Sequence, residues 1–195
     1  ASAGTALGRI QIAWAEYANS ENEILSAYVS PANSAGDTIH TSNGGPMQVR
    51  SDVAAGANGY MFPYRSEIAA QSRIMAHPLD ADGAPLTPEP IQLDAGSAIN
   101  GPMGPSVAWN GSLYLVAWAN ASGIVAQRIQ QDGSLVDPSP VLVMSGFGAT
   151  DVAAVGEVFL VGGRTIGYSP EVIYPIGKRL RGSDGVILDA TPITL

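Results

Sequence analysis

The sequence repeats one unit four times, and this repeat limits the possible folds more than any other feature. Its clearest marker is a tetrapeptide made of proline, an apolar residue, any residue and a second apolar residue. Copies stand at 46–49, 90–93, 140–143 and 192–195, separated by 44, 50 and 52 residues. A second marker, Asp/Ser-Val-Ala followed by an apolar residue, occurs at 52–55, 106–109 and 151–154, and residues 2–5 are a degraded copy. Periods of this length are typical of repeats that each form one supersecondary unit.

Each unit reads as four short strands. In residues 105–143, apolar alternating runs are separated by Asn-Gly, by Asn-Ala-Ser-Gly and by Asp-Gly, which are strong hairpin signals. The pattern predicts second strands at 10–14, 60–64, 113–118 and 158–163. It predicts third strands at 24–29, 73–79, 124–129 and 172–180. The proline tetrapeptides are expected to form the outer strands that close each unit.

The expected fold is all-β, because no apolar stripe has helical spacing and 23 Gly with 14 Pro interrupt the chain throughout. Four antiparallel four-stranded units at this period predict a β-propeller that is one domain, 1–195. Its blades are expected at about 1–49, 50–104, 105–148 and 149–195. The four blades either close into one ring, which is the preferred reading, or form part of a larger ring.

Composition narrows the possible partners. Charged residues make up only 13%, and 9 basic against 17 acidic residues give a net charge of -8. The basic residues are mostly scattered, so a nucleic acid partner is not expected. No apolar run is long enough to cross a bilayer. The low charge and the start without methionine favour a secreted, cell-surface or periplasmic protein, and the charge-poor surface favours a protein partner or self-association.

Residues 105–143 resemble a repeat of exported bacterial β-propellers. The matching segments are Val-Ala-Trp-Asn-Gly at 107–111, Tyr-Leu-Val-Ala-Trp at 114–118 and Ile-Val-Ala-Gln-Arg-Ile at 124–129. Residues 151–195 match in part, whereas the first two units match only at the markers. The resemblance implies a propeller with a binding or scaffolding role.

A weaker resemblance is to the hemopexin-like four-bladed propeller, which opens inner strands with segments similar to 52–55 and 151–154. There is no cysteine pair to close the ring. This resemblance implies only the blade number and an ion on the axis.

Two aspartates are the candidate site. Asp52 and Asp151 open inner strands in the second and fourth units, with Ser2 and Ser106 at the same position in the other two. In a closed four-bladed ring the two carboxylates would face each other across the axis. They could cap turns, bind a cation such as Ca²⁺ together with Ser2 and Ser106, or act as the acid pair of a glycosidase.

Aromatic residues are the second group of candidates. Trp14, Tyr64 and Trp118 end second strands at equivalent positions, where core packing is expected. Tyr17, Tyr168 and Tyr174 lie in less regular segments and are the candidate exposed binding residues.

Enzyme motifs are not evident. The sequence contains no nucleophile elbow, zinc-protease helix or phosphate-binding loop. Its two histidines, His40 and His77, read as exposed loop residues, and Asp80-Ala81-Asp82-Gly83 reads as a hairpin turn rather than a metal loop.

The sequence therefore predicts a non-catalytic binding or scaffolding propeller that engages another protein and holds a cation on its axis. The alternative from a different class is a carbohydrate-binding lectin or a glycosidase-type propeller. No catalytic residue and no cofactor other than Ca²⁺ is expected.

Overall fold

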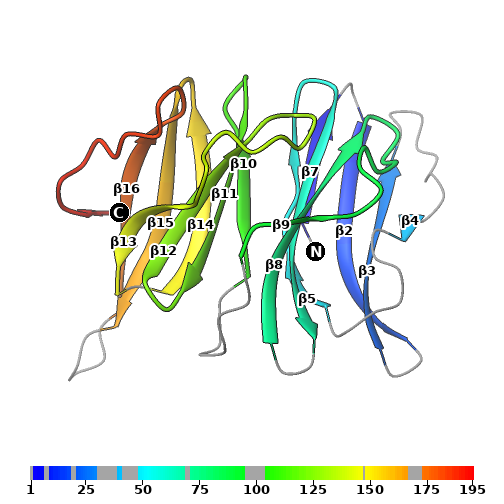
Figure 1. Cartoon of the computed structure of the whole chain (residues 1–195), viewed down its shortest axis with the longest axis horizontal. Coiled ribbons are helices and arrows are strands. Elements are labelled where there is room, and N and C mark those ends of the chain that lie inside the picture. Colours follow the sequence, from blue (N-terminus) through cyan, green and yellow to red (C-terminus); the bar gives the residue numbers. More distant parts are fainter. Residues whose placement is uncertain are drawn as a thin grey trace.

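The structure is a computed structural model that describes residues 2–6, 9–18, 21–29, 39–40, 48–68, 71–94, 104–146, 148–166 and 173–195. For residues 2–51 it describes the backbone of the strands and not their side chains. The described residues form strands and turns, without a helix (Figure 1). No helix in this part of the chain is long and apolar enough to span a membrane.

Four antiparallel sheets follow one another along the chain. The first contains β1 (Ser2–Ala6), β2 (Arg9–Ala18), β3 (Glu21–Val29) and β4 (Ile39–His40). The second contains β5 (Gln48–Ser51), β6 (Ala54–Ala55), β7 (Gly59–Ile68), β8 (Gln71–Asp80) and β9 (Ile91–Gln92). The third contains β10 (Ser106–Trp109), β11 (Tyr114–Asn120), β12 (Gly123–Ile129) and β13 (Val141–Ser145). The fourth contains β14 (Gly148–Val155), β15 (Val158–Ile166), β16 (Ile173–Arg181) and β17 (Ile193–Thr194).

The strand order within each sheet confirms the predicted blade, with the marker Asp/Ser-Val-Ala on or beside the first strand. The pairing of first and second strands has the same register in all four blades. Ser2 pairs with Ala13, Ser106 with Ala117 and Asp151 with Gly162, and the Asp52 amide donates to the Pro63 carbonyl. Each partner lies eleven residues further along the chain, so the four units superpose without a gap in this hairpin.

The outer strands follow the prediction in three blades. β9, β13 and β17 contain residues of the tetrapeptides at 90–93, 140–143 and 192–195. The first tetrapeptide, at 46–49, was misassigned: Gln48 and Val49 pair with Ser66 and Arg65 of the second blade. The outer strand of the first blade is instead β4, which pairs with Leu25 and Ser26. An apolar segment between two blades can extend the inner strand of the second blade as readily as it can form the outer strand of the first.

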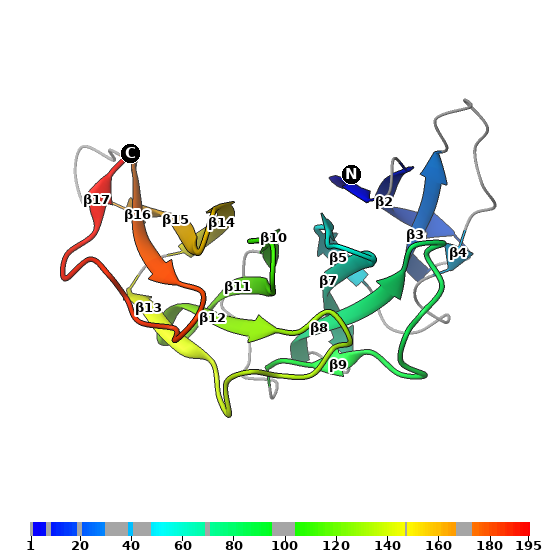
Figure 2. The ribbon, with the colours of Figure 1, turned by 90° about the horizontal axis from the view of Figure 1, so that it is seen from above.

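The four blades lie along an open arc, with the N-terminal sheet at one end and the C-terminal sheet at the other (Figure 2). The preferred prediction of a closed four-bladed ring was wrong: the first and fourth sheets do not meet, and the arc corresponds to the alternative, part of a larger ring. The innermost strands β10 and β14 pack against each other, as do β1 and β6.

Apolar side chains fill the space between neighbouring blades. Between the second and third blades, Met61 and Ile74 pack with Val116 and Trp118. Between the third and fourth, Leu115 and Ala117 pack with Phe159 and Val161. Because the third sheet buries one face on the second blade and the other on the fourth, its strands are apolar on both sides.

Polar side chains form the turns. The Asp80 carboxylate accepts from the amides of Asp82 and Ala84 at 2.9 and 2.8 Å, which confirms the predicted hairpin turn. Asn110 Oδ1 likewise accepts hydrogen bonds from the amides of Ser112 and Leu113, both at 3.0 Å. Such side-chain acceptors are the physical basis of the turn preference of Asn and Asp.

Candidate functional site on the inner strands

Asp52, Ser106 and Asp151 stand at the same register position of three consecutive blades: Ser106 begins β10, Asp151 lies within β14, and Asp52 lies between β5 and β6. Oδ2 of Asp52 accepts from the Ser106 hydroxyl at 2.9 Å and from the Val107 amide at 3.0 Å. Oδ1 of Asp52 accepts from the Val53 amide at 2.8 Å. Ser106 Oγ in turn accepts from the Val152 amide at 3.2 Å.

Asp151 completes the row on the other side of Ser106. Its Oδ1 accepts from its neighbour's amide, that of Val152, at 2.9 Å and lies 3.4 Å from Ser106 Oγ. The two aspartates were expected to face each other across a closed ring. Instead they flank one serine hydroxyl, because the blades follow an arc and the third blade stands between the second and the fourth.

The members of the row differ in exposure. Ser106 is buried, Asp52 is half-buried and Asp151 is exposed. The side chain of Ser2, the fourth predicted member, is not among those described. The described part of the chain contains no group of three or more His, Cys, Asp or Glu side chains arranged to hold a metal ion. An axial cation on Asp52 and Asp151 stays a prediction.

The predicted tyrosines lie at one end of the blades, whereas the row lies near the middle of the strands: Asp151 pairs with Gly162, in the middle of β15. We call this end the hairpin face: the inner strands begin there, and each second strand ends there and its third strand begins, on the lower side of Figure 1. Tyr17 pairs with Asn22 beside the β2–β3 connection, and Tyr174 pairs with Thr165 beside the β15–β16 connection. Tyr174 is 51% exposed. The Tyr17 side chain is not described, and Tyr168 lies outside the described residues.

The aromatic residues at the ends of the second strands belong to the core, as predicted, in the two blades where their side chains are described. Trp118 is fully buried, and its Nε1 donates to Asp94 Oδ2 at 2.8 Å. Tyr64 is buried, and this burial, with a smaller contribution from the Glu89 charge, raises its pKa to about 12. These rings are therefore not a sugar-stacking platform.

His77 was wrongly expected in an exposed loop. It lies in β8, is 4% exposed, and its Nε2 is 3.0 Å from the Thr87 carbonyl oxygen. Gln127 of the third blade occupies the corresponding place, with its Nε2 donating to the Asp137 carbonyl at 2.8 Å. His77 thus ties the third strand to the segment that follows it. His40 lies in β4, and its side chain is not described.

A buried ion pair was missed by the sequence reasoning. Arg128 of β12 is held by Asp137: its Nε lies 3.1 and 3.0 Å from the two carboxylate oxygens, and its amide donates to Oδ2 at 3.1 Å. Arg179 and Asp189 repeat this geometry in the fourth blade. A signal for this pair was present in the sequence: in both blades an arginine of the third strand is followed nine or ten residues later by an aspartate.

The row on the inner strands and the four repeated sheets define this chain as a β-propeller whose blades form only part of a ring. No protein-family model matches the sequence, and no curated protein matches it.

Solved structures do match the fold. A thermostable family-43 glycoside hydrolase is 15% identical with a TM-score of 0.57, over 95% of this chain and 72% of that one. A GH43 endo-arabinanase from Bacillus licheniformis is 12% identical with a TM-score of 0.58, over 100% and 78%. The catalytic domain of a Coprinopsis cinerea GH62 α-L-arabinofuranosidase is 14% identical with a TM-score of 0.56, over 95% and 65%.

At these identities the likeness establishes the propeller fold and nothing finer. This chain spans 65 to 78% of the length of those three structures. They give the hemopexin-like resemblance no support.

Proposed function

We propose that the protein is a carbohydrate-binding propeller of exported type, with its glycan site around Asp151 on the inner strand of the fourth blade. The carrying observation is the exposed Asp151 carboxylate beside Ser106, on an inner strand of a propeller whose structural neighbours include glycoside hydrolases. One carboxylate oxygen has no hydrogen-bond partner among the described residues. A free carboxylate oxygen accepts bonds from sugar hydroxyls, and the exposed ring of Tyr174, on the third strand of the same blade, offers a flat apolar surface.

The hydrogen bonds that Asp52 accepts favour sugar binding over sugar hydrolysis as the function. A glycosidase needs two carboxyl groups that both face the substrate, one to donate a proton and one to act as base or nucleophile. Both oxygens of Asp52 already accept hydrogen bonds from the protein, two from backbone amides and one from Ser106. Asp52 therefore supports the row, and Asp151 is the member that faces a ligand.

The test is isothermal titration calorimetry with arabinan and arabinoxylan oligosaccharides, because the neighbours named above include an endo-arabinanase and an arabinofuranosidase. We expect binding that falls at least about tenfold in Asp151→Ala, since a hydrogen bond to a charged group contributes about 1.5–3 kcal/mol. Asp132→Ala is the matched control, because Asp132 is an exposed turn carboxylate that accepts from the Ser134 amide on the third blade.

Two results would contradict the proposal. One is the absence of binding to any oligosaccharide of a broad glycan panel. The other is an affinity that is the same in Asp151→Ala as in the unmodified protein. Release of reducing sugar that depends on both Asp52 and Asp151 would instead favour the glycosidase.

An axial cation is a second candidate, supported by the approach of the Asp52 and Asp151 carboxylates to one hydroxyl. Oxygen-rich sites of this kind suit Ca²⁺. Native mass spectrometry in Ca²⁺ would show one retained ion, which the double variant Asp52→Asn, Asp151→Asn would lose. An unchanged mass in the unmodified protein would rule the candidate out.

A further inference from the structure

The chain contains four Asn-Gly pairs, at 43–44, 58–59, 100–101 and 110–111. The structure describes the second and the fourth of them. In such a pair the backbone nitrogen that follows the asparagine can attack the side-chain amide carbon, and glycine favours this reaction because it has no side chain that shields the nitrogen. The two described pairs differ in the surroundings of the reacting atoms.

Three donors converge on the side-chain oxygen of Asn110. Its Oδ1 accepts from the Ser112 amide at 3.0 Å, from the Ser112 hydroxyl at 3.1 Å and from the Leu113 amide at 3.0 Å. These bonds polarise the carbonyl group and make its carbon, Cγ, more electrophilic. When a nucleophile adds to Cγ, the negative charge that develops on Oδ1 meets donors that are already in place, as in an oxyanion hole.

The nucleophile, the Gly111 backbone nitrogen, belongs to the same turn. The hydrogen bond from the Ser112 amide to Asn110 Oδ1 closes a ring of atoms that contains both Cγ and this nitrogen, so it keeps the two near each other. Gly111 is exposed, and a Cβ added to it would meet no atom within 4 Å. Solvent therefore has access to the reacting atoms.

The pair at 58–59 has different surroundings. Gly59 begins β7, is buried and pairs with Asp80. A Cβ added to Gly59 would collide with the Leu79 carbonyl oxygen. The backbone that follows Asn58 is thus held in the sheet and closely packed, so we expect Asn58 to react slowly.

Asn120 provides a comparison without glycine. Its Oδ1 accepts from the Ser122 amide at 2.9 Å, so its turn resembles that of Asn110. The next residue is Ala121, whose methyl group shields the backbone nitrogen. In addition, Nδ2 of Asn120 lies 3.5 Å from Asp94 Oδ2, and the charge of this carboxylate disfavours a second negative charge on the asparagine side chain. Asn120 should therefore also react more slowly than Asn110.

We propose that Asn110 is a site of spontaneous modification, at which the side-chain amide becomes a carboxylate with release of ammonia. The Gly111 nitrogen loses its proton to hydroxide and forms a bond to Asn110 Cγ. The bond between Cγ and Nδ2 then breaks, and Nδ2 takes a proton from water and leaves as ammonia. Water opens the resulting cyclic imide at either carbonyl, which gives aspartate or isoaspartate. The net reaction consumes one water molecule and needs no enzyme or cofactor.

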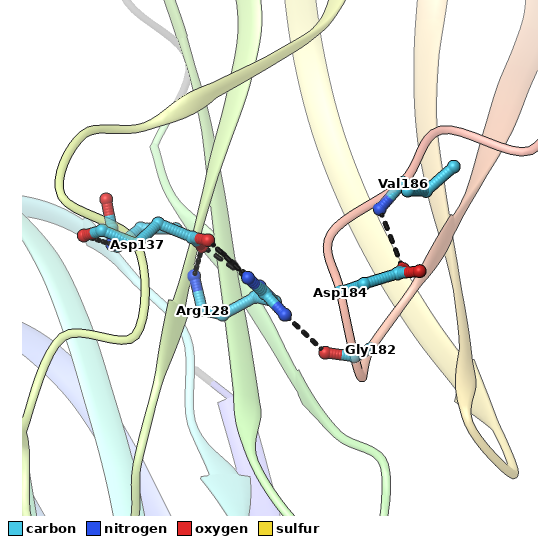
Figure 3. Close-up of polar contacts among 6 residues, drawn as sticks. Arg128, Asp137, Gly182, Asp184 and Val186 are labelled. Atoms are coloured by element: carbon cyan, nitrogen blue, oxygen red, sulfur yellow. Dashed lines mark hydrogen bonds and ion pairs between the residues drawn. The ribbon is translucent and has the colours of Figure 1, made fainter.

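The reaction places a charge at the boundary between the third and fourth blades. The Asn110 amide lies on Gly182, where an added Cβ would collide with Nδ2 and stand 3.0 Å from the Glu157 carbonyl oxygen. The Gly182 carbonyl accepts from Arg128 Nη1 at 2.7 Å (Figure 3), and its amide donates to the Glu157 carbonyl at 2.7 Å. In the product a negative oxygen takes the place of Nδ2 near the Glu157 carbonyl. The repulsion should weaken the contact between the two blades.

The experiment follows the full chain over time in a mildly alkaline buffer, because hydroxide removes the proton from the attacking nitrogen. Tandem mass spectrometry of proteolytic peptides locates each conversion by the replacement of an NH group with oxygen, and water enriched in heavy oxygen should label the product. We expect Asn110 to react about tenfold faster than Asn58 and Asn120, or more. A rate at Asn110 that does not exceed the rates at those two would overturn the proposal.

Two matched variants test the role of the donors. Ser112→Ala removes the hydroxyl donor to Asn110 Oδ1 but keeps the amide donor, so it should slow the reaction about tenfold. Ser122→Ala makes the same change in the turn of Asn120 and should leave the Asn110 rate unchanged. A turn that only restrained Asn110 would be loosened in Ser112→Ala and would react faster. An equal or faster rate in this variant, with folding confirmed by circular dichroism, would overturn the proposal.

Asn110→Asp tests the effect on the blade boundary. The variant keeps Oδ1 for the turn and places a negative oxygen where Nδ2 stands. Its midpoint of chemical denaturation should lie below that of the unmodified protein, and a midpoint at or above it would overturn the assigned effect. No glycan is present in any of these measurements, so their results do not depend on the proposed function.

Discussion

The hydroxyl of Ser106 donates a hydrogen bond of 2.9 Å to Asp52, which stands 54 residues earlier in the chain and in the preceding blade. The same carboxylate oxygen accepts from the Val107 amide. Among the described strands, none pairs with a strand of a neighbouring blade, and side chains supply the polar contacts between these blades. Asp52 is such a contact between the second and third blades.

Replacing Asp52 with alanine should destabilise the protein by about 1–3 kcal/mol, because the Val107 amide and the buried Ser106 hydroxyl lose their acceptor. Asp52→Asn should cost less, since the amide oxygen can still accept one bond. Chemical denaturation followed by tryptophan fluorescence measures the difference, with Asp132→Ala as the exposed carboxylate control. A loss no greater in Asp52→Ala than in that control would show that the contact contributes nothing to stability.

The two arginine–aspartate pairs offer a comparison within one chain. Asp137→Ala should cost about 3–5 kcal/mol, because it leaves the Arg128 charge buried without its carboxylate counter-charge. Asp189→Ala removes the same geometry at an exposed site, where water solvates the released Arg179, and should have a much smaller effect. Thermal and chemical unfolding of the two variants tests this order. Equal losses would contradict the assignment of burial as the cause.

Acid should break the ion pair between Arg179 and Asp189. The side-chain and backbone hydrogen bonds from Arg179 lower the pKa of Asp189 to about 2, below its value of about 4 in an unfolded chain. A carboxyl group with a lowered pKa stabilises the fold above the unfolded value, and this stabilisation is lost as the pH falls from about 4 toward 2.

Carboxyl-carbon NMR of the protein should show Asp189 titrating near pH 2. In Arg179→Ala the midpoint should move up to the ordinary range for aspartate. A midpoint near 4 in the unmodified protein would refute the pairing.

Local sequence was sufficient to predict the blade. Asn-Gly, Asp-Gly and alternating apolar residues specify a hairpin through contacts within a few residues, so the second and third strands were placed correctly in every unit. The tetrapeptide at 46–49 failed because short outer strands have weak local signals and its residues pair with the second blade. The prediction that His77 is exposed failed for a related reason. Its ring contacts the Thr87 carbonyl, which belongs to a segment ten residues away.

The candidate site was predicted in part. The marker Asp/Ser-Val-Ala placed Asp52, Ser106 and Asp151 at one register position, and the structure brings these three together. The marker did not reveal that Asp52 accepts hydrogen bonds from the next blade, nor that Asp151 is exposed. Those roles depend on which blade follows, information that is absent from any single repeat.

The sequence by itself determined the repeating unit, its strands and its turns, because these depend on neighbours within one hairpin. The tertiary structure decided how the blades meet: an open arc, a serine between two aspartates, and an arginine in each of the last two blades, one covered and one exposed. These contacts join residues roughly one repeat apart, and the packing of side chains between sheets sets the angle at which successive blades turn.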